Sequence, residues 1–146
     1  MAEMRRVLRP GGLAAVCDDD IGTFVISPDR PELGLAATLF ERAVAHEGGN
    51  ARYSRHLRTL MLEAGFAPTQ GVAHAPEVYG DAASTRWFAE FAIGLFGAAR
   101  MREVIVAEGW ATGTELDAMI AAIRDWAELP DAFAAWLYCG ALGWTG

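Results

Sequence analysis

The stretch that decides the fold is residues 3–20, EMRRVLRPGGLAAVCDDD. Apolar residues at helical spacing precede the Pro-Gly-Gly turn at residues 10–12, which predicts the end of a helix. The apolar run that follows, residues 13–17, is continuous rather than alternating. Such a run predicts a strand covered on both faces, as in a parallel sheet. We expect this strand to stop at the three aspartates of residues 18–20, which would mark its carboxyl end.

The rest of the chain alternates predicted helices with predicted strands. The closing segment is ambiguous between helix and strand by period, but its aromatic residues favour a strand. The order strand, helices, strand, helical stretch, strand predicts an α/β fold. Helices are expected over about residues 33–47, 51–64 and 82–108 and from Thr112 or Thr114 to 128, and strands over 70–79 and 131–144.

Composition excludes several classes of protein. The 146 residues are 53 % hydrophobic and 21 % charged, which is enough apolar content for a packed core. The net charge of −7 argues against non-specific binding to nucleic acid or to an anionic membrane. All 12 basic residues are arginine, so a lysine base, Schiff base or phosphate-loop lysine is excluded. With no apolar run near the roughly 20 residues of a membrane span and no signal peptide, a cytoplasmic location is expected.

Cysteine and histidine carry little chemistry in this sequence. The two cysteines, Cys17 and Cys139, stand in apolar surroundings and are expected to be buried thiols. The three histidines, at positions 46, 56 and 74, are scattered without metal-ligand spacing, so no metal site is expected.

Two segments carry a resemblance to a known family. Residues 3–13 resemble the mid-chain signature of class I S-adenosylmethionine-dependent methyltransferases, in which a helix ending in Pro-Gly-Gly feeds the fifth strand. Residues 58–66, RTLMLEAGF, resemble the helix that precedes the sixth strand of that family. Residues 130–133, with 143–144, look like the seventh strand. The nearest subfamilies by resemblance are the type 11/25-like methyltransferases and their relatives in ubiquinone and menaquinone biosynthesis.

The resemblance implies an α/β fold that is the C-terminal portion of a Rossmann-like seven-stranded sheet, strands five to seven. It implies a single partial domain over residues 1–146, with helix, strand, helices and strand over 1–80. A helical lid insert over 81–128 and the last strand over 129–146 would follow. In the family, the seventh strand lies antiparallel between the fifth and the sixth.

The sequence departs from the family where the cofactor should bind. The family holds S-adenosylmethionine by a glycine-rich loop after the first strand and an acidic residue after the second. Glycines let the backbone approach the ligand, and a carboxylate accepts the ribose hydroxyls. Here the glycines at 11–12 precede a strand, and no Gly-x-Gly-x-x-Gly occurs. We therefore expect a methyltransferase fragment that is inactive alone, has no cofactor-binding residues and does not bind S-adenosylmethionine unaided.

Candidate substrate-binding residues come from three places in the chain. Open α/β sheets place ligands outside the carboxyl ends of their strands. The resemblance implies that the start of the helix near residue 52 and the helical insert also face a small-molecule methyl acceptor. The alternatives are a solvated loop for the aspartates, an exposed helix face for the histidine, core packing for the tryptophan and a surface ion pair for Arg86. The candidates are Asp18, Asp20, Arg52, His56, Arg86 and Trp87, and the catalytic residues are unknown.

The predicted strand at residues 13–17 would form an apolar edge, which invites pairing with another chain. We expect a homodimer or a companion chain at this edge, and no nucleic-acid or membrane partner. Two alternative functions remain open: a non-catalytic partner or interaction fragment, and a small-ligand-binding module that uses the aromatic residues of the insert.

Overall fold

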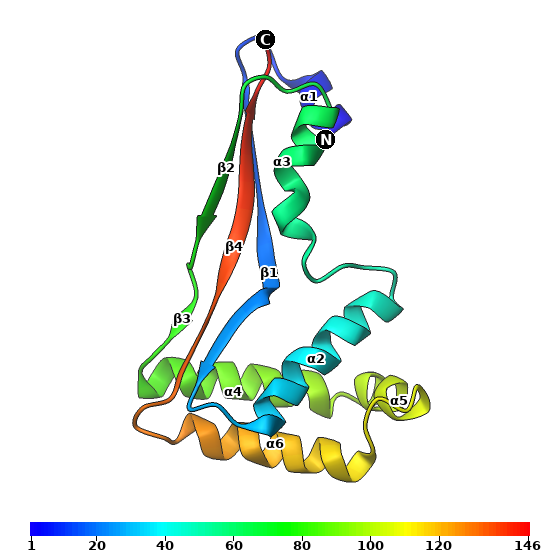
Figure 1. The fold of residues 1–146 in the computed structure, drawn as a ribbon, viewed down its shortest axis with the longest axis vertical. Helices are drawn as coiled ribbons and strands as arrows, with labels where there is room; N and C mark the ends of the chain where they lie inside the picture. Colours follow the sequence, from blue (N-terminus) through cyan, green and yellow to red (C-terminus); the bar gives the residue numbers. More distant parts are fainter. The chain divides into compact units, whose positions relative to one another are not determined.

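The computed structural model describes all of residues 1–146 and combines helices with an open antiparallel sheet of four strands (Figure 1). None of the helices has the length and apolar character that crossing a membrane requires. The elements are α1 (Ala2–Val7), β1 (Leu13–Ser27), α2 (Pro31–His46), the 3₁₀ helix η1 (Tyr53–His56), α3 (Leu57–Glu63), β2 (Thr69–His74), β3 (Val78–Tyr79), α4 (Ala82–Gly97), α5 (Ala99–Ala107), α6 (Gly113–Ala127) and β4 (Phe133–Trp144).

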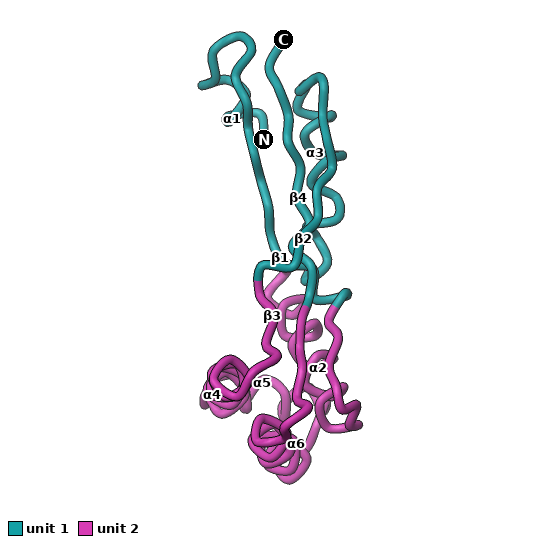
Figure 2. The backbone as a smooth tube through the Cα atoms, turned by 90° about the vertical axis from the view of Figure 1, so that its left-hand side faces the viewer, with its two compact units in different colours: residues 1–23, 51–76, 136–146 teal, residues 24–50, 77–135 magenta.

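The chain forms two compact units, coloured separately in Figure 2. Unit 1 comprises residues 1–23, 51–76 and 136–146, and unit 2 comprises residues 24–50 and 77–135. Strands β1 and β4 each contribute residues to both units. The segment expected as a helical insert lies wholly in unit 2, together with α2.

The last strand of the chain is the central strand of unit 1. Strand β4 lies between β1 and β2, as expected, and pairs antiparallel with β2. Helix α3 packs on this sheet (Figure 1). The core consists of apolar side chains from the sheet, from α3 and from the turn after it: Ala14, Leu57, Met61, Phe66 and Ala141.

The prediction for the first strand was wrong in two respects. Strand β1 does not stop at the aspartates but continues to Ser27, and its sheet is antiparallel rather than parallel. Burial alternates at its start, where Ala14 is buried while Leu13 and Ala15 are exposed. The physical reason is the partner: β4 supplies backbone hydrogen bonds along a comparable length, and these bonds do not depend on side-chain type. A solvated face then tolerates aspartate within the strand.

Two further expected elements are interrupted. The strand expected over residues 70–79 is divided into β2 and β3, with Pro76 in the gap, because proline cannot donate to a strand ladder. The long helix expected over 82–108 is divided into α4 and α5 at Ala98, whose extended backbone (ψ 132°) ends the helical hydrogen bonding. The closing segment is a strand, as its aromatic residues favoured.

Unit 2 is built on α4 and α6, which run side by side, with α2 packed against α6 (Figures 1 and 2). Their facing surfaces are apolar and include the fully buried Leu116, Met119 and Trp126. Helix α6 begins with a capping box at Thr112, whose partner is Glu115. The sequence left Thr112 and Thr114 open as caps, and Thr112 is the one observed.

Two glycines let the strands and helix of unit 1 approach closely. A Cβ atom at Gly140 would lie 2.6 Å from the backbone oxygen of Val16 in β1. A Cβ at Gly143 would lie 2.7 Å from the sulfur of Met61 in α3. Neither distance is compatible with van der Waals contact, so both positions require glycine.

Replacing Gly140 with alanine should lower the free energy of unfolding by about 1–3 kcal/mol, because the new methyl group meets backbone that cannot move without shifting β1. The matched control is Gly34→Ala in α2, where an added Cβ meets nothing within 4 Å. That substitution should stabilise the protein by about 0.5–1 kcal/mol, through helix propensity alone. Urea unfolding measures both, and equal effects would contradict the close approach.

Candidate functional site

The six predicted substrate-binding residues fall into two groups. Asp18, Asp20, Arg52 and His56 belong to unit 1, whereas residues 86–87 belong to unit 2. Each group is described within its own unit.

Asp20 is a buried carboxylate that pairs with a partly exposed arginine. Asp20 is only 1 % exposed, whereas the Arg55 side chain is 42 % exposed. Nε and Nη2 of Arg55 donate to the two carboxylate oxygens of Asp20 over 2.7 and 2.6 Å. The backbone N–H of Gly22 donates a third hydrogen bond, over 3.0 Å. The Arg55 hydrogen bonds hold the pKa of the Asp20 carboxyl below its ordinary value, against the opposing effect of burial. The Asp20 carboxylate thus accepts three hydrogen bonds from within the protein.

Among the other predicted residues of unit 1, Arg52 lies next to this pair. A Cβ at Gly22 would lie 2.8 Å from Nη2 of Arg55 and 2.9 Å from Nε of Arg52, so the bare glycine backbone lets both arginine side chains lie across β1. The Arg52 charge also contributes to the lowered pKa of Asp20. We call Asp20, Gly22, Arg52 and Arg55 the arginine–aspartate cluster. Sequence reasoning missed Arg55, because nothing local marks a partner 35 residues from Asp20.

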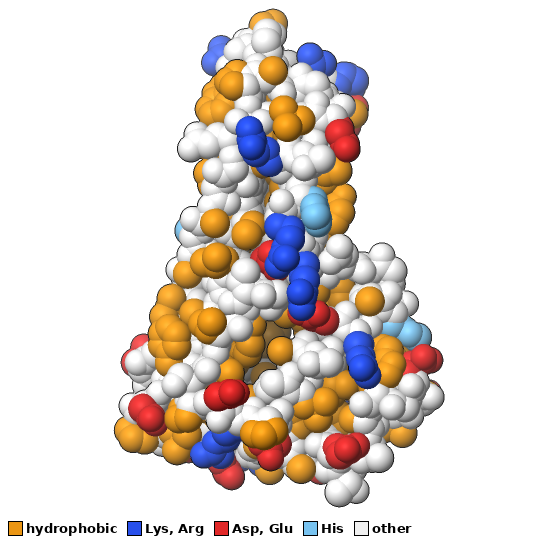
Figure 3. Space-filling model, in the orientation of Figure 1, with side chains coloured by type: hydrophobic (Ala, Val, Ile, Leu, Met, Phe, Trp, Pro, Cys, Tyr) orange, Lys and Arg blue, Asp and Glu red, His pale blue; other side chains and the backbone are white.

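Asp18 and His56 are exposed beside this cluster. An Asp18 carboxylate oxygen accepts a hydrogen bond from the backbone N–H of Asp19, over 3.0 Å. The rings of His56 and Tyr53 lie 6.4 Å apart on η1, and both side chains face solvent. Figure 3 shows basic side chains gathered on one face along the η1–α3 segment. Groups able to exchange protons therefore stand at this surface next to fixed positive charge.

Replacing Arg55 with methionine should lower the free energy of unfolding at pH 7 by about 3 kcal/mol, because a buried carboxylate loses its partner. The stability that comes from a lowered carboxyl pKa is fully present above the unfolded-state pKa of about 4. It is lost as the pH falls through the folded-state pKa of Asp20, which lies lower. The difference between the wild type and Arg55→Met should therefore shrink below about pH 4, as measured by urea unfolding at several pH values.

The matched control for that experiment is Arg86→Met. Arg86 makes a similar two-bond pair with Glu128, over 2.9 and 3.0 Å, but both side chains are more than half exposed. Its loss should cost less than about 1 kcal/mol. Equal costs for the two variants would contradict the role of burial at Asp20.

In unit 2, stacked aromatic side chains link α4, β3 and α6. The Phe91 and Trp87 rings are 6.0 Å apart and within 6° of parallel, and Trp87 and Tyr79 are 5.8 Å apart and within 15°. Tyr79 stacks on Phe88 at 4.9 Å, and Phe88 meets the edge of Trp126 at 5.9 Å. We call these five residues the aromatic ladder. The spacings lie in the range that aromatic pairs prefer.

The inner end of the ladder is anchored and its outer end is open. Trp126 is fully buried, and its Nε1–H donates to the carbonyl of Ser27 over 2.9 Å. By contrast, Trp87 is 57 % exposed and Phe91 is 56 % exposed. The alternative of core packing for Trp87 is therefore not what the structure shows, because more than half of its surface is exposed. Figure 3 shows hydrophobic side chains gathered over the β3–α4 part of this unit.

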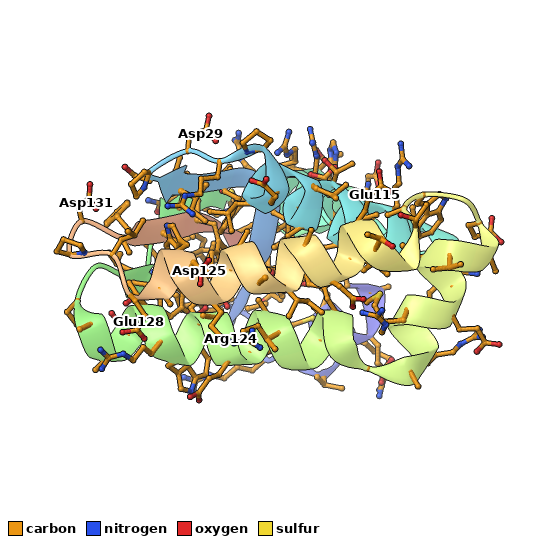
Figure 4. All side chains as sticks on the ribbon, turned by 90° about the horizontal axis from the view of Figure 1, so that it is seen from below. Asp29, Glu115, Arg124, Asp125, Glu128 and Asp131 are labelled. Carbon is orange, nitrogen blue, oxygen red and sulfur yellow. The ribbon has the colours of Figure 1, made fainter.

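Arg86, next to Trp87 in the chain, pairs with Glu128. The two side chains form the surface ion pair that was the alternative to a substrate contact. Figure 4 shows Glu128 at the end of α6 beside α4, with Arg124 and Asp125 on the preceding turn of α6.

Unit 2 also contains a largely apolar hollow of about 500 Å³ between α2 and the α4–α5 junction. None of the six predicted residues lines it. Its walls include Phe40, Val44, Leu95 and Met101, with Glu47 and Arg100 as its charged residues.

The glycine turn before β1 does not fit a nucleotide-binding role. The backbone N–H of Gly11 donates to the carbonyl of Thr145, and that of Gly12 donates to the Thr145 hydroxyl, both over 2.9 Å. Backbone donors that already have partners cannot receive a phosphate or carboxylate. The N–H groups of Gly11 and Gly12 therefore have no free hydrogen for such a ligand. No group of three or more histidine, cysteine, aspartate or glutamate side chains is arranged to hold a metal ion.

The prediction that both cysteines are buried was wrong. Cys17 is exposed, and Cys139 is partly exposed. A Cβ at Gly140 would lie 3.3 Å from the Cβ of Cys17, so Cys17 shares a face with Gly140, and strand alternation turns the neighbouring Cys139 to the other face. Partial desolvation, followed by the Asp18 charge, raises the pKa of the Cys17 thiol. A raised pKa disfavours the nucleophilic thiolate.

Comparison with known proteins gives one informative likeness. No family model matches the chain. It is 29 % identical over 150 residues to a protein named probable methyltransferase ltbC, from Aspergillus luteorubrus. The likeness covers 99 % of this chain and 52 % of that protein, so the chain spans about half the length of the curated relative it matches. This likeness relates the chain to a methyltransferase.

Proposed function

We propose that this chain is part of an S-adenosylmethionine-dependent methyltransferase that acts on a small-molecule acceptor. The likeness to a probable methyltransferase over 99 % of the chain carries the proposal. The two motifs support it. Residues 10–12 form the turn between α1 and β1, and residues 58–66 run from α3 through Gly65, whose φ of +84° caps the helix. The central, antiparallel position of β4 is a further support.

In this proposal the chain supplies the acceptor side of the enzyme and not the cofactor cradle. S-adenosylmethionine would supply the methyl group in the complete enzyme. Methyl transfer depends mostly on holding the acceptor atom in line, which is a matter of positioning. The exposed candidate groups for an acceptor in unit 1 are Asp18, Arg52 and His56, and Trp87 of unit 2 is a separate candidate. Among them, His56 is the candidate proton acceptor for a hydroxyl or amine nucleophile.

The coding sequence upstream of Met1 is the first test of the proposal. We expect an in-frame or adjacent segment that encodes a strand, a glycine-rich turn and a helix. Co-expressed with this chain, that segment should give an assembly that binds S-adenosylmethionine in calorimetry and transfers a labelled methyl group to a small molecule. An assembly that co-purifies without binding the cofactor would favour a non-catalytic interaction fragment.

The chain alone should not bind S-adenosylmethionine, because the N–H groups of its glycine turn already donate to Thr145. Calorimetry with the purified chain should give no binding heat at micromolar or submillimolar cofactor. S-adenosylhomocysteine, which shares the nucleoside, serves as the second ligand. Micromolar affinity for either would contradict the absence of a cofactor cradle.

The proposal includes a partner at the open edge of the sheet, either a second copy or a companion chain. Strand β1 is an edge strand, with β4 on one side only. Leu13 at its start is 48 % exposed, and Ala15 and Cys17 are exposed as well. An apolar edge with unpaired backbone groups is a template for another strand.

Light scattering on the purified chain should therefore give a mass above that of one chain, increasing with concentration. Ala15→Lys places a charge on the edge without entering the core, and should shift the protein toward the monomer. Leu62→Lys, on the exposed surface of α3, is the control and should leave the association unchanged. A monodisperse monomer at high concentration would contradict association through the edge.

A further inference from the structure

The outer end of the aromatic ladder presents an aromatic face with no ring stacked upon it. Phe91 is the last member, and its only ring neighbour is Trp87. Both side chains are exposed over more than half of their surface. Folded proteins bury most of their aromatic surface. Two adjacent aromatic rings that are exposed and parallel therefore require an explanation.

The inner part of the ladder is held by several contacts. Tyr79 is buried and donates its hydroxyl to Glu77 over 2.9 Å, and it stacks against both Trp87 and Phe88. Strand β3 holds Tyr79 opposite Ala134 of β4. A ligand that adds to an already ordered stack does not have to order it, and this favours binding.

The exposed area suits a small molecule better than a protein. An aromatic side chain offers about 150–250 Å², so Trp87 and Phe91 together expose on the order of 250 Å². A stable protein interface buries about 800 Å² on each partner. One face of a two-ring molecule matches the exposed stack in size.

The charges around the stack select against anions. Arg86, the nearest cation along the helix, is paired with Glu128. Glu90 follows Trp87 by three residues and therefore lies beside it on the surface of α4. A negatively charged ligand stacked on Trp87 would meet the carboxylate of Glu90, and this repulsion disfavours its binding.

We propose that Trp87 and Phe91 form a binding site for neutral, planar aromatic molecules, which stack on the open end of the ladder. A role of this site in holding an aromatic methyl acceptor rests on the proposed function. The binding of an aromatic molecule at the site does not depend on that function, and it is measured without S-adenosylmethionine.

The test is a titration of the full chain with 2-naphthol, followed by ligand NMR or calorimetry. The saturated analogue, 2-decalol, keeps the size and the hydroxyl group but is not planar, and 2-naphthoate keeps the rings but carries a negative charge. We expect 2-naphthol to bind about tenfold more tightly than either analogue. Equal binding of 2-naphthol and 2-decalol, or no binding of 2-naphthol at millimolar concentration, would overturn the proposal.

Variants locate the site. Trp87→Leu should weaken 2-naphthol binding about tenfold, and Phe91→Leu severalfold, whereas Trp87→Tyr should retain most of it because a planar ring remains. Val106→Ala, at an exposed apolar position on α5 of the same unit, is the control and should bind as the wild type. Circular dichroism verifies that each variant is folded.

Undiminished binding in both leucine variants would place the ligand elsewhere and overturn the proposal. The outcomes also separate the site from the enzyme. Binding of 2-naphthol lost in Trp87→Leu would support the site even if the assembled protein transferred no methyl group. Methyl transfer without any 2-naphthol binding would refute the site and leave the proposed function standing.

Discussion

The structure of unit 1 depends on the antiparallel pairing of β4, the last strand of the chain. Its residues pair with β2 through six register positions, from Thr69 opposite Gly143 to His74 opposite Tyr138, and β1 lies on its other side. Thr145, just beyond it, accepts hydrogen bonds from the glycine turn that begins β1 and donates its own N–H to Gly12. The two ends of the chain are thereby joined. Residues that are far apart in sequence must meet before this sheet exists.

The length of β1 places three consecutive aspartates inside the sheet rather than beyond its end. Alternation puts Asp18 and Asp20 on the same face of the strand, so their different exposure comes from the arginine side chain that pairs with Asp20. Asp18 is exposed, while Asp20 is buried and needs the guanidinium of Arg55 as its partner. A buried carboxylate without a charge partner is strongly unfavourable. The arginine–aspartate cluster is therefore first a structural feature, with Asp18 and His56 as the groups it leaves at the surface.

The sequence motifs and the similarity to a curated protein both suggest a methyltransferase. The motifs around residues 3–13 and 58–66 resemble a methyltransferase family, and the chain is similar over its length to a probable methyltransferase. The structure adds the chemistry of the chain itself. The N–H groups of its glycine turn donate to Thr145, and the aromatic ladder ends in the exposed rings of Trp87 and Phe91.

The sequence by itself determined the α/β content, the approximate positions of α2 and α6, and the strand character of the closing segment. These depend on local signals: the capping box at Thr112, glycine and proline at element ends, and apolar period. Only the tertiary structure decided the length of β1, the pairing of Asp20 with Arg55, and the exposure of Trp87. Each of these depends on a partner strand or side chain that is distant in the sequence. Local spacing carries no information about such a partner, because hydrogen bonding and burial are settled only when the distant segments pack together.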